Sequence, residues 1–157
     1  MLKNRHRIKR RDSKKLIENI ESSLGCNVDG VIEIADYKNR KLILIDGKIC
    51  GFFIEGNPFL NISGLKKWKP SKKYVMVDDG AIKFILNGAD VMAPGIIKAD
   101  EEIQKGDAVW IKDMRDIPLS VGIALVDGME MTKADKGKAV KNIHYIGDEI
   151  WKLSENF

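Results

Sequence analysis

The chain has 157 residues, of which 44% are hydrophobic and 32% charged, with a formal net charge of +4. This composition is typical of one globular domain of ordinary size or two small ones, and it excludes a disordered chain. It also excludes a transmembrane helix, because no stretch approaches about 18 uncharged apolar residues, and the basic N-terminus leads into no apolar segment of a secretory signal.

The positive charge is concentrated at the start of the chain. Residues 1–15 contain eight Lys and Arg and one acidic residue, whereas residues 75–157 contain ten basic and fifteen acidic residues. Such a polarised distribution is typical of a protein with a nucleic-acid partner. A solubilising or flexible basic arm would have the same composition, so this alternative stays open.

The first predicted elements are a strand and a helix. Residues 5–11 fit a short edge strand, which must be exposed on at least one face because it is so basic. A helix follows with Asp12 or Ser13 as its N-cap, and it ends at Gly25, which readily adopts the left-handed conformation. The predicted buried face of this helix consists of apolar residues at helical spacing: Leu16, Ile17, Ile20 and Leu24.

A strand-rich stretch with a second helix is predicted next. The predicted strands are residues 31–34, 42–45 and 48–54. Asp46-Gly47 between the last two is a hairpin signal, because both central residues of the tight turn need positive φ. Gly56-Asn57-Pro58 should end the third strand. A short helix is expected within residues 59–69, with Ser63 near its start and Trp68 near its end.

Residues 66–73 carry five lysines around Trp68 and Pro70, and we place a domain boundary there. Pro70 cannot continue a helix, and the composition is that of a linker. The stretch could instead be a basic patch whose Trp68 stacks on a base. We favour the linker, which divides the chain into domains of residues 1–73 and 74–157.

The second domain is predicted as short strands with one main helix. Asp78 or Asp79 caps that helix, which runs through Leu86 and ends at Asn87-Gly88. A further short helix is possible over residues 128–135. The predicted strands are residues 74–77, 91–92, 108–111, 119–126, 138–145 and 149–153. This order indicates an α+β fold, an N-terminal α/β domain followed by a small mixed barrel.

The most informative segment is 77–96, VDDGAIKFILNGADVMAPGI. Its small residues flank Val91-Met92 and would let another backbone approach closely, while exposed N–H groups could hold phosphate or sugar oxygens. Lys83 precedes Asn87 by four positions, so both share a helix face that leads into the loop. A cation beside a glycine-rich loop suits a phosphate backbone, although the glycines could equally serve tight turns alone.

Residues 74–153 resemble a PUA domain, an RNA-binding module named after pseudouridine synthases and archaeosine transglycosylases. The resemblance is carried by several motifs in the family's order: Asp79-Gly80-Ala81, residues 87–95 (NGADVMAPG), Val121-Gly122-Ile123-Ala124, Gly137-Lys138-Ala139-Val140, Asn142-Ile143-His144-Tyr145 and Asp148-Glu149-Ile150-Trp151. It implies a PUA-type mixed β pseudo-barrel with one main helix.

The first half is similar to the pre-PUA domain of one PUA subgroup, through Asp46-Gly47, Phe52-Phe53 and Gly56-Asn57-Pro58-Phe59. That subgroup is the malignant T-cell-amplified sequence family, with its yeast translation machinery-associated relative and archaeal counterparts. The high Ile and Lys content also looks archaeal. Membership implies a cytoplasmic, non-enzymatic RNA-binding protein of the translation apparatus. Its expected partners are rRNA or tRNA, the small ribosomal subunit and a translation-factor protein.

The resemblance also implies where RNA binds. The PUA pattern places the RNA surface on the main helix and the loop that follows, at Lys83, Asn87, Gly88, Ala89, Asp90, Val91, Met92 and Ala93, with Lys152 as a further candidate. Asp90 is unusual for such a loop, because its carboxylate repels phosphate. We therefore expect residues 66–73 and the basic N-terminal arm to supply much of the attraction, the arm through Arg5, Arg7, Lys9, Arg10 and Arg11.

No cofactor or metal site is expected. His6 lies among cations and His144 in a predicted strand, where it should be packed or hydrogen-bonded. Cys26 and Cys50 form no CxxC pair and should be reduced core thiols. Two alternative functions remain. One is an RNA-gripping subunit of a tRNA transglycosylase or pseudouridine synthase, although about seventy residues is short for such a catalytic domain. The other is a protein-interaction adaptor, in which the first domain binds a protein and the PUA fold is only a scaffold.

Overall fold

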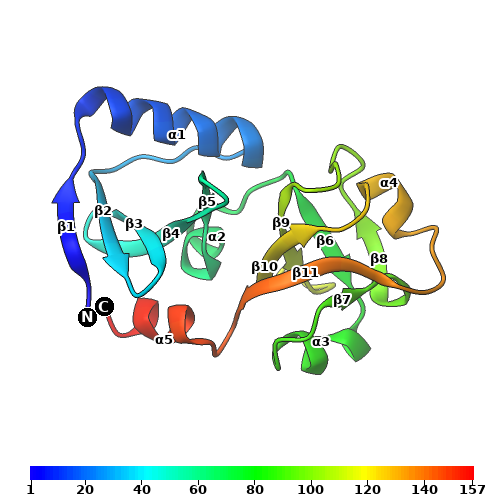
Figure 1. Cartoon of the computed structure of the whole chain (residues 1–157). Coiled ribbons are helices and arrows are strands. Elements are labelled where there is room, and N and C mark those ends of the chain that lie inside the picture. The colour runs from blue at the N-terminus through cyan, green and yellow to red at the C-terminus, as the bar shows by residue number, and fades with distance from the viewer. The chain divides into compact units, whose positions relative to one another are not determined.

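A computed structural model describes all residues from Met1 to Phe157 (Figure 1). The chain divides into two compact units, which are described separately below. Unit 1 consists of Met1–Ser71 together with Lys152–Phe157, and unit 2 of Lys72–Trp151. The sequence predicts a boundary after residue 73, with residues 152–157 in the second domain. No helix is long and apolar enough to cross a membrane.

Unit 1 is built on an antiparallel five-stranded sheet in the order β1-β2-β3-β4-β5. Figure 1 shows α1 along one side of this sheet. The elements of the first 71 residues are β1 (Lys3–Arg7), α1 (Arg10–Leu24), β2 (Ile32–Tyr37), β3 (Arg40–Ile45), β4 (Lys48–Ile54), β5 (Asn57–Leu60) and α2 (Ile62–Trp68).

The amphipathic pattern of α1 correctly identified its buried face, but not its first residue. Leu16, Ile20 and Leu24 are buried, and Gly25 ends the helix at φ 68°. The predicted N-cap at Asp12 or Ser13 was wrong, because the helix already begins at Arg10 with Lys9 as an N-cap that makes no side-chain hydrogen bond. Arginine is a good helix former, which permits this earlier start.

The turns of unit 1 follow from local chemistry. Asp46 and Gly47 both have positive φ, as the β3–β4 hairpin requires. Asn61 caps α2 by accepting a hydrogen bond from the Gly64 N–H at 3.0 Å. Gly64 must lack a side chain, since a Cβ there would collide with the carbonyl oxygen of Cys50. The third strand ends at Ile54, as predicted, but Glu55 and Gly56 then form a tight turn into β5, an edge strand that tolerates Pro58.

The C-terminal segment has a different secondary structure from the one predicted. Residues 149–153 were expected to form a strand, but α5 (Glu149–Glu155) is a helix. Asp148 precedes it and accepts a hydrogen bond from the Trp151 N–H at 2.8 Å, which satisfies a first-turn donor. In unit 1, Ser154 accepts a hydrogen bond from the Asn61 side chain at 3.0 Å.

Unit 2 is a six-stranded sheet in the order β7-β11-β10-β9-β6-β8, in which only β6 and β9 pair in parallel. Its elements are β6 (Tyr74–Val77), α3 (Asp79–Ile85), β7 (Val91–Met92), the 3₁₀ turn η1 (Ala93–Gly95), β8 (Ile96–Ala99), β9 (Ala108–Lys112), β10 (Pro118–Ala124), α4 (Gly128–Met131) and β11 (Lys138–Tyr145). β8 was not predicted, and α4 is shorter than the expected 128–135.

The strands of unit 2 enclose an apolar core that includes Val75, Val91, Ile111 and Val140. His144 is fully buried beside it, and its Nδ1 lies 2.9 Å from Oδ2 of Asp148. This confirms the expectation of a packed, hydrogen-bonded histidine. The predicted α+β fold class and mixed barrel are confirmed as well.

Candidate nucleic-acid interface

The candidate site begins with α3, whose formation follows from its cap. Of the two predicted caps, Asp78 is the one used: it accepts a hydrogen bond from the Ala81 N–H at 3.0 Å, and Ile85 packs into the core. Phe84 precedes Ile85 in α3, and 58% of its surface is exposed. A large aromatic side chain is therefore held at the surface by a short, capped helix.

The loop after α3 uses its own backbone donors. The N–H groups of Asn87 and Ala89 donate to the carbonyl oxygen of Phe84 at 3.1 and 3.0 Å, and that of Gly88 donates to Ile85 at 3.0 Å. The expectation that exposed loop N–H groups hold phosphate is therefore wrong for these three residues, because the chain continues as a helical turn.

Strand β11 fixes the same loop from the other side. The Asn142 side chain donates to the carbonyl oxygens of Ile85 and Ala89 at 3.1 and 3.0 Å, and its backbone N–H donates to Asp90 at 3.0 Å. Gly88 has φ 90°, and a Cβ there would lie 3.1 Å from the hydroxyl oxygen of Tyr145. The loop is thus pre-ordered by contacts to β11.

Asp90 has a structural role, because both of its carboxylate oxygens contact residues of β11. One carboxylate oxygen accepts the Asn142 N–H, and the other lies 3.1 Å from Nζ of Lys138. The Asn142 N–H, with further contributions from Lys138 and Lys141, lowers the pKa of Asp90 below its ordinary value despite partial burial. Its negative charge is therefore compensated by the protein.

An open groove of about 830 Å³ lies between α3 and the loop that leads into β7 and η1. Phe84 contributes to one wall and Met92, which is 46% exposed, to the other. The remaining lining is mostly small or apolar: Asp78, Gly80, Ala81, Ile85, Gly88, Ala89, Asp90, Val91, Pro94, Gly95 and Lys138. Such a lining favours the flat face of a base over a bare phosphate.

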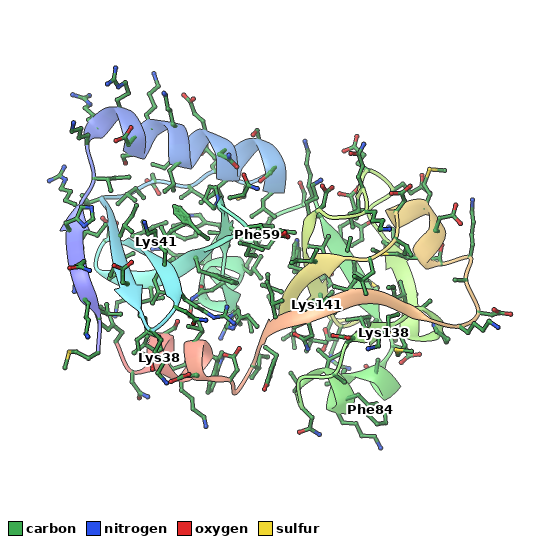
Figure 2. All side chains as sticks on the ribbon, viewed as in Figure 1. Lys38, Lys41, Phe59, Phe84, Lys138 and Lys141 are labelled. Atoms are coloured by element: carbon green, nitrogen blue, oxygen red, sulfur yellow. The ribbon has the colours of Figure 1, made fainter.

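Three lysines lie on α3 and β11, two of the elements whose residues line this groove. Lys83 places its Nζ 5.1 Å from the centroid of the Phe84 ring, and Lys138 lies at the rim. Lys141 is exposed on β11 and acts electrostatically on Asp90. Figure 2 shows Phe84 on α3, and Lys138 and Lys141 on β11. The site therefore combines an apolar floor with cations that can neutralise phosphates.

The structure brings together part of the predicted site. Gly88, Ala89, Asp90, Val91 and Met92 line the groove. The side chains of Lys83 and Asn87 are exposed outside its lining, and Ala93 is buried. Sequence reasoning missed Phe84, Lys138 and Lys141. Phe84 had a detectable signal, because it is the large apolar residue that α3 does not need for its buried face.

The candidates at the N-terminus and Lys152 belong to unit 1. Arg5 already forms an ion pair within unit 1, because its Nε lies 2.9 Å from Oε2 of Glu33. Its guanidinium also lies 5.3 Å from the centroid of the Phe157 ring. Lys152 is exposed in the last turn of α5. The remaining candidates are all exposed, namely Arg7, Lys9, Arg10 and Arg11. No three His, Cys, Asp or Glu side chains cluster as metal ligands would.

Comparison with known families assigns both halves of the chain. Residues 73–146 match the model of the PUA domain, and residues 4–62 match the model described as Domain of unknown function (DUF1947). A conserved PUA domain protein from Thermoplasma acidophilum has the same fold, with a TM-score of 0.84, 32% identity and coverage of 96% of this chain and 99% of that one.

Curated relatives extend over most of the chain. An uncharacterized protein of Methanocaldococcus jannaschii is 43% identical, over 97% of this chain and 98% of that protein. Translation machinery-associated protein 20 of Saccharomyces cerevisiae is 32% identical, over 73% and 67%. Malignant T-cell-amplified sequence 2 of Homo sapiens is 26% identical, over 80% and 72%. The chain therefore belongs to the family of PUA-domain proteins that includes translation machinery-associated protein 20 and the malignant T-cell-amplified sequence proteins.

Proposed function

We propose that this protein binds RNA without chemical conversion and acts in the translation apparatus. The groove of unit 2 takes one or two unpaired nucleotides, whose bases lie against Phe84 and Met92. Lys83 and Lys141 neutralise the neighbouring phosphates, while Lys138 is paired with Asp90. The observation that carries this proposal is the open, mostly apolar groove of about 830 Å³ with lysines around it.

Two features of the groove support binding without an induced change. Its loop is already hydrogen-bonded to β11 through Asn142. Asp90 lines the groove and has a lowered pKa, and its negative charge is compensated by Lys138. A pre-ordered site loses little conformational entropy when it binds, so a short unpaired segment is sufficient as a ligand.

The role in translation is supported by the family. Relatives bear the name translation machinery-associated protein, which suggests rRNA of the small ribosomal subunit or tRNA as the ligand, together with a translation-factor protein as partner, in initiation or recycling. A cytoplasmic location accompanies this role.

Crosslinking in native extract tests the proposal. The tagged chain is irradiated with ultraviolet light, purified under denaturing conditions, and its attached RNA is sequenced. The proposal expects enrichment of rRNA or tRNA, with crosslinked peptides from the groove of unit 2. Absence of RNA above an untagged control, or crosslinks that avoid the groove, would contradict it.

A further inference from the structure

The first turns of α1 carry a cluster of cations that the fold does not use. Its members are Lys9, Arg10, Arg11, Lys14 and Lys15, here called the α1 basic surface. All five are exposed, and none forms an ion pair. Asp12 is the only acidic residue in the first turn. Figure 2 shows nitrogen-tipped side chains that project outward from this part of α1.

This placement is unfavourable for the helix itself. A helix N-terminus carries partial positive charge, so cations in the first turns cost stability rather than add it. The N-cap Lys9 also provides no side-chain hydrogen bond to the exposed N–H groups. Folding therefore gives no reason for the cluster, whereas an anionic partner would.

The cluster is held on a fixed support. Leu16 and Ile20 anchor α1 to the core of unit 1. At about 100° per residue, Arg11, Lys14 and Lys15 project from the side opposite these anchors. From Lys9 to Lys15 the helix extends over roughly 9 Å. Along that length of axis a nucleic-acid duplex carries about five phosphate charges.

The α1 basic surface contains no aromatic residue, unlike the groove of unit 2. Proteins that hold single strands combine cations with aromatic platforms for the bases, and this surface offers cations alone. We propose that it binds the phosphate backbone of double-helical RNA, as a second site separate from the groove. This inference depends on the proposed function in one respect only, namely that the ligand is RNA.

A charge-removing variant tests the second site. Arg11→Gln, Lys14→Gln and Lys15→Gln together remove three cations and retain good helix formers. The matched control is Lys105→Gln, Lys133→Gln and Lys136→Gln, which removes three exposed cations from unit 2. Fluorescence anisotropy across a salt series measures binding of a blunt RNA hairpin and of an unpaired oligonucleotide.

We expect the α1 variant to lose at least about tenfold in hairpin affinity at low salt, with a salt slope smaller by about 2–3. Binding of the unpaired oligonucleotide should change much less. The control should bind both RNAs as the unmodified chain does. Thermal unfolding should show a midpoint unchanged or raised, because unfavourable charges have left the helix N-terminus.

Three outcomes would overturn the inference: an unmodified chain that does not bind the hairpin, an unchanged hairpin salt slope in the α1 variant, or equal losses in the variant and its control. The last result would show a dependence on net charge alone. The α1 variant leaves the groove of unit 2 unchanged, so failure of groove binding appears with the unpaired oligonucleotide and failure of the second site appears in the comparison of the α1 variant with its control.

Discussion

Asn142 and Ala89 are joined by a hydrogen bond of 3.0 Å from the Asn142 side-chain amide to the Ala89 carbonyl oxygen, across 53 positions of sequence. The same amide also donates to Ile85. One side chain of β11 therefore satisfies two carbonyl groups at the end of α3 and fixes the wall of the groove.

Asn142→Ala should loosen this wall. Removal of the amide leaves the two carbonyl oxygens without that donor, which should lower the free energy of unfolding by about 1–3 kcal/mol. Affinity for unpaired RNA should fall as well, because the groove is no longer pre-ordered. Urea unfolding and anisotropy measure the two effects. Asn27→Ala, an exposed change in unit 1, serves as the control and should alter neither quantity.

Gly88→Ala and Gly137→Ala distinguish two ways in which an added side chain destabilises the loops of unit 2: backbone strain at positive φ, and steric contact with a neighbouring residue. Both glycines have positive φ, of 90° and 98°, so each variant carries backbone strain of about 1 kcal/mol. A Cβ at Gly137 meets nothing within 4 Å, whereas at Gly88 it meets Tyr145 at 3.1 Å. Gly88→Ala should therefore be the more destabilising in urea unfolding. Equal losses would show that Tyr145 does not restrict the loop.

Asp148→Asn tests the acid stability of unit 2. Burial alone would raise the pKa of Asp148, but the His144 ring, with the N–H groups of Trp151 and Tyr145, lowers it below the ordinary value. A lowered folded-state pKa stabilises the fold above the unfolded value of about 4, and this stabilisation is lost as pH falls through the folded-state pKa.

Urea midpoints at pH 7 and at lower pH down to about 3 should therefore decline steeply for the unmodified chain. They should decline less for Asp148→Asn, which already lacks the carboxylate at pH 7 and is less stable there. Asp135→Asn, which changes an exposed carboxylate far in sequence from His144, should retain the steep decline. Identical profiles for the unmodified chain and Asp148→Asn would contradict the role of this carboxylate.

Local sequence signals predicted the parts of the fold that local chemistry decides. The spacing of Leu16, Ile20 and Leu24 identified α1, Asp46-Gly47 identified a hairpin, and Asp78 identified the start of α3. Residues 149–153 misled, because a short segment with Ile150, Trp151 and Leu153 as its apolar residues fits a strand as well as a helix. The Asp148 cap was the contrary signal.

The candidate site depends on contacts that no local pattern contains. Lys138 reaches the groove because β11 pairs with β7, where Lys138 lies opposite Met92. The loop after α3 was predicted as a phosphate cradle from its glycines, but its N–H groups close a helical turn. The sequence therefore indicated a segment that lines the groove, while the chemistry of the groove became visible only once β11 was placed beside it.

The most direct test of the groove is the affinity of Phe84→Ala for an unpaired RNA oligonucleotide at fixed salt. Met129→Ala is the matched control, because Met129 is similarly exposed in unit 2 but lies outside the groove. The account predicts a loss of about 1–3 kcal/mol in binding for Phe84→Ala, the worth of one stacked base, with no loss for the control. Unchanged affinity of a folded Phe84→Ala chain would contradict the proposal that this groove holds RNA bases.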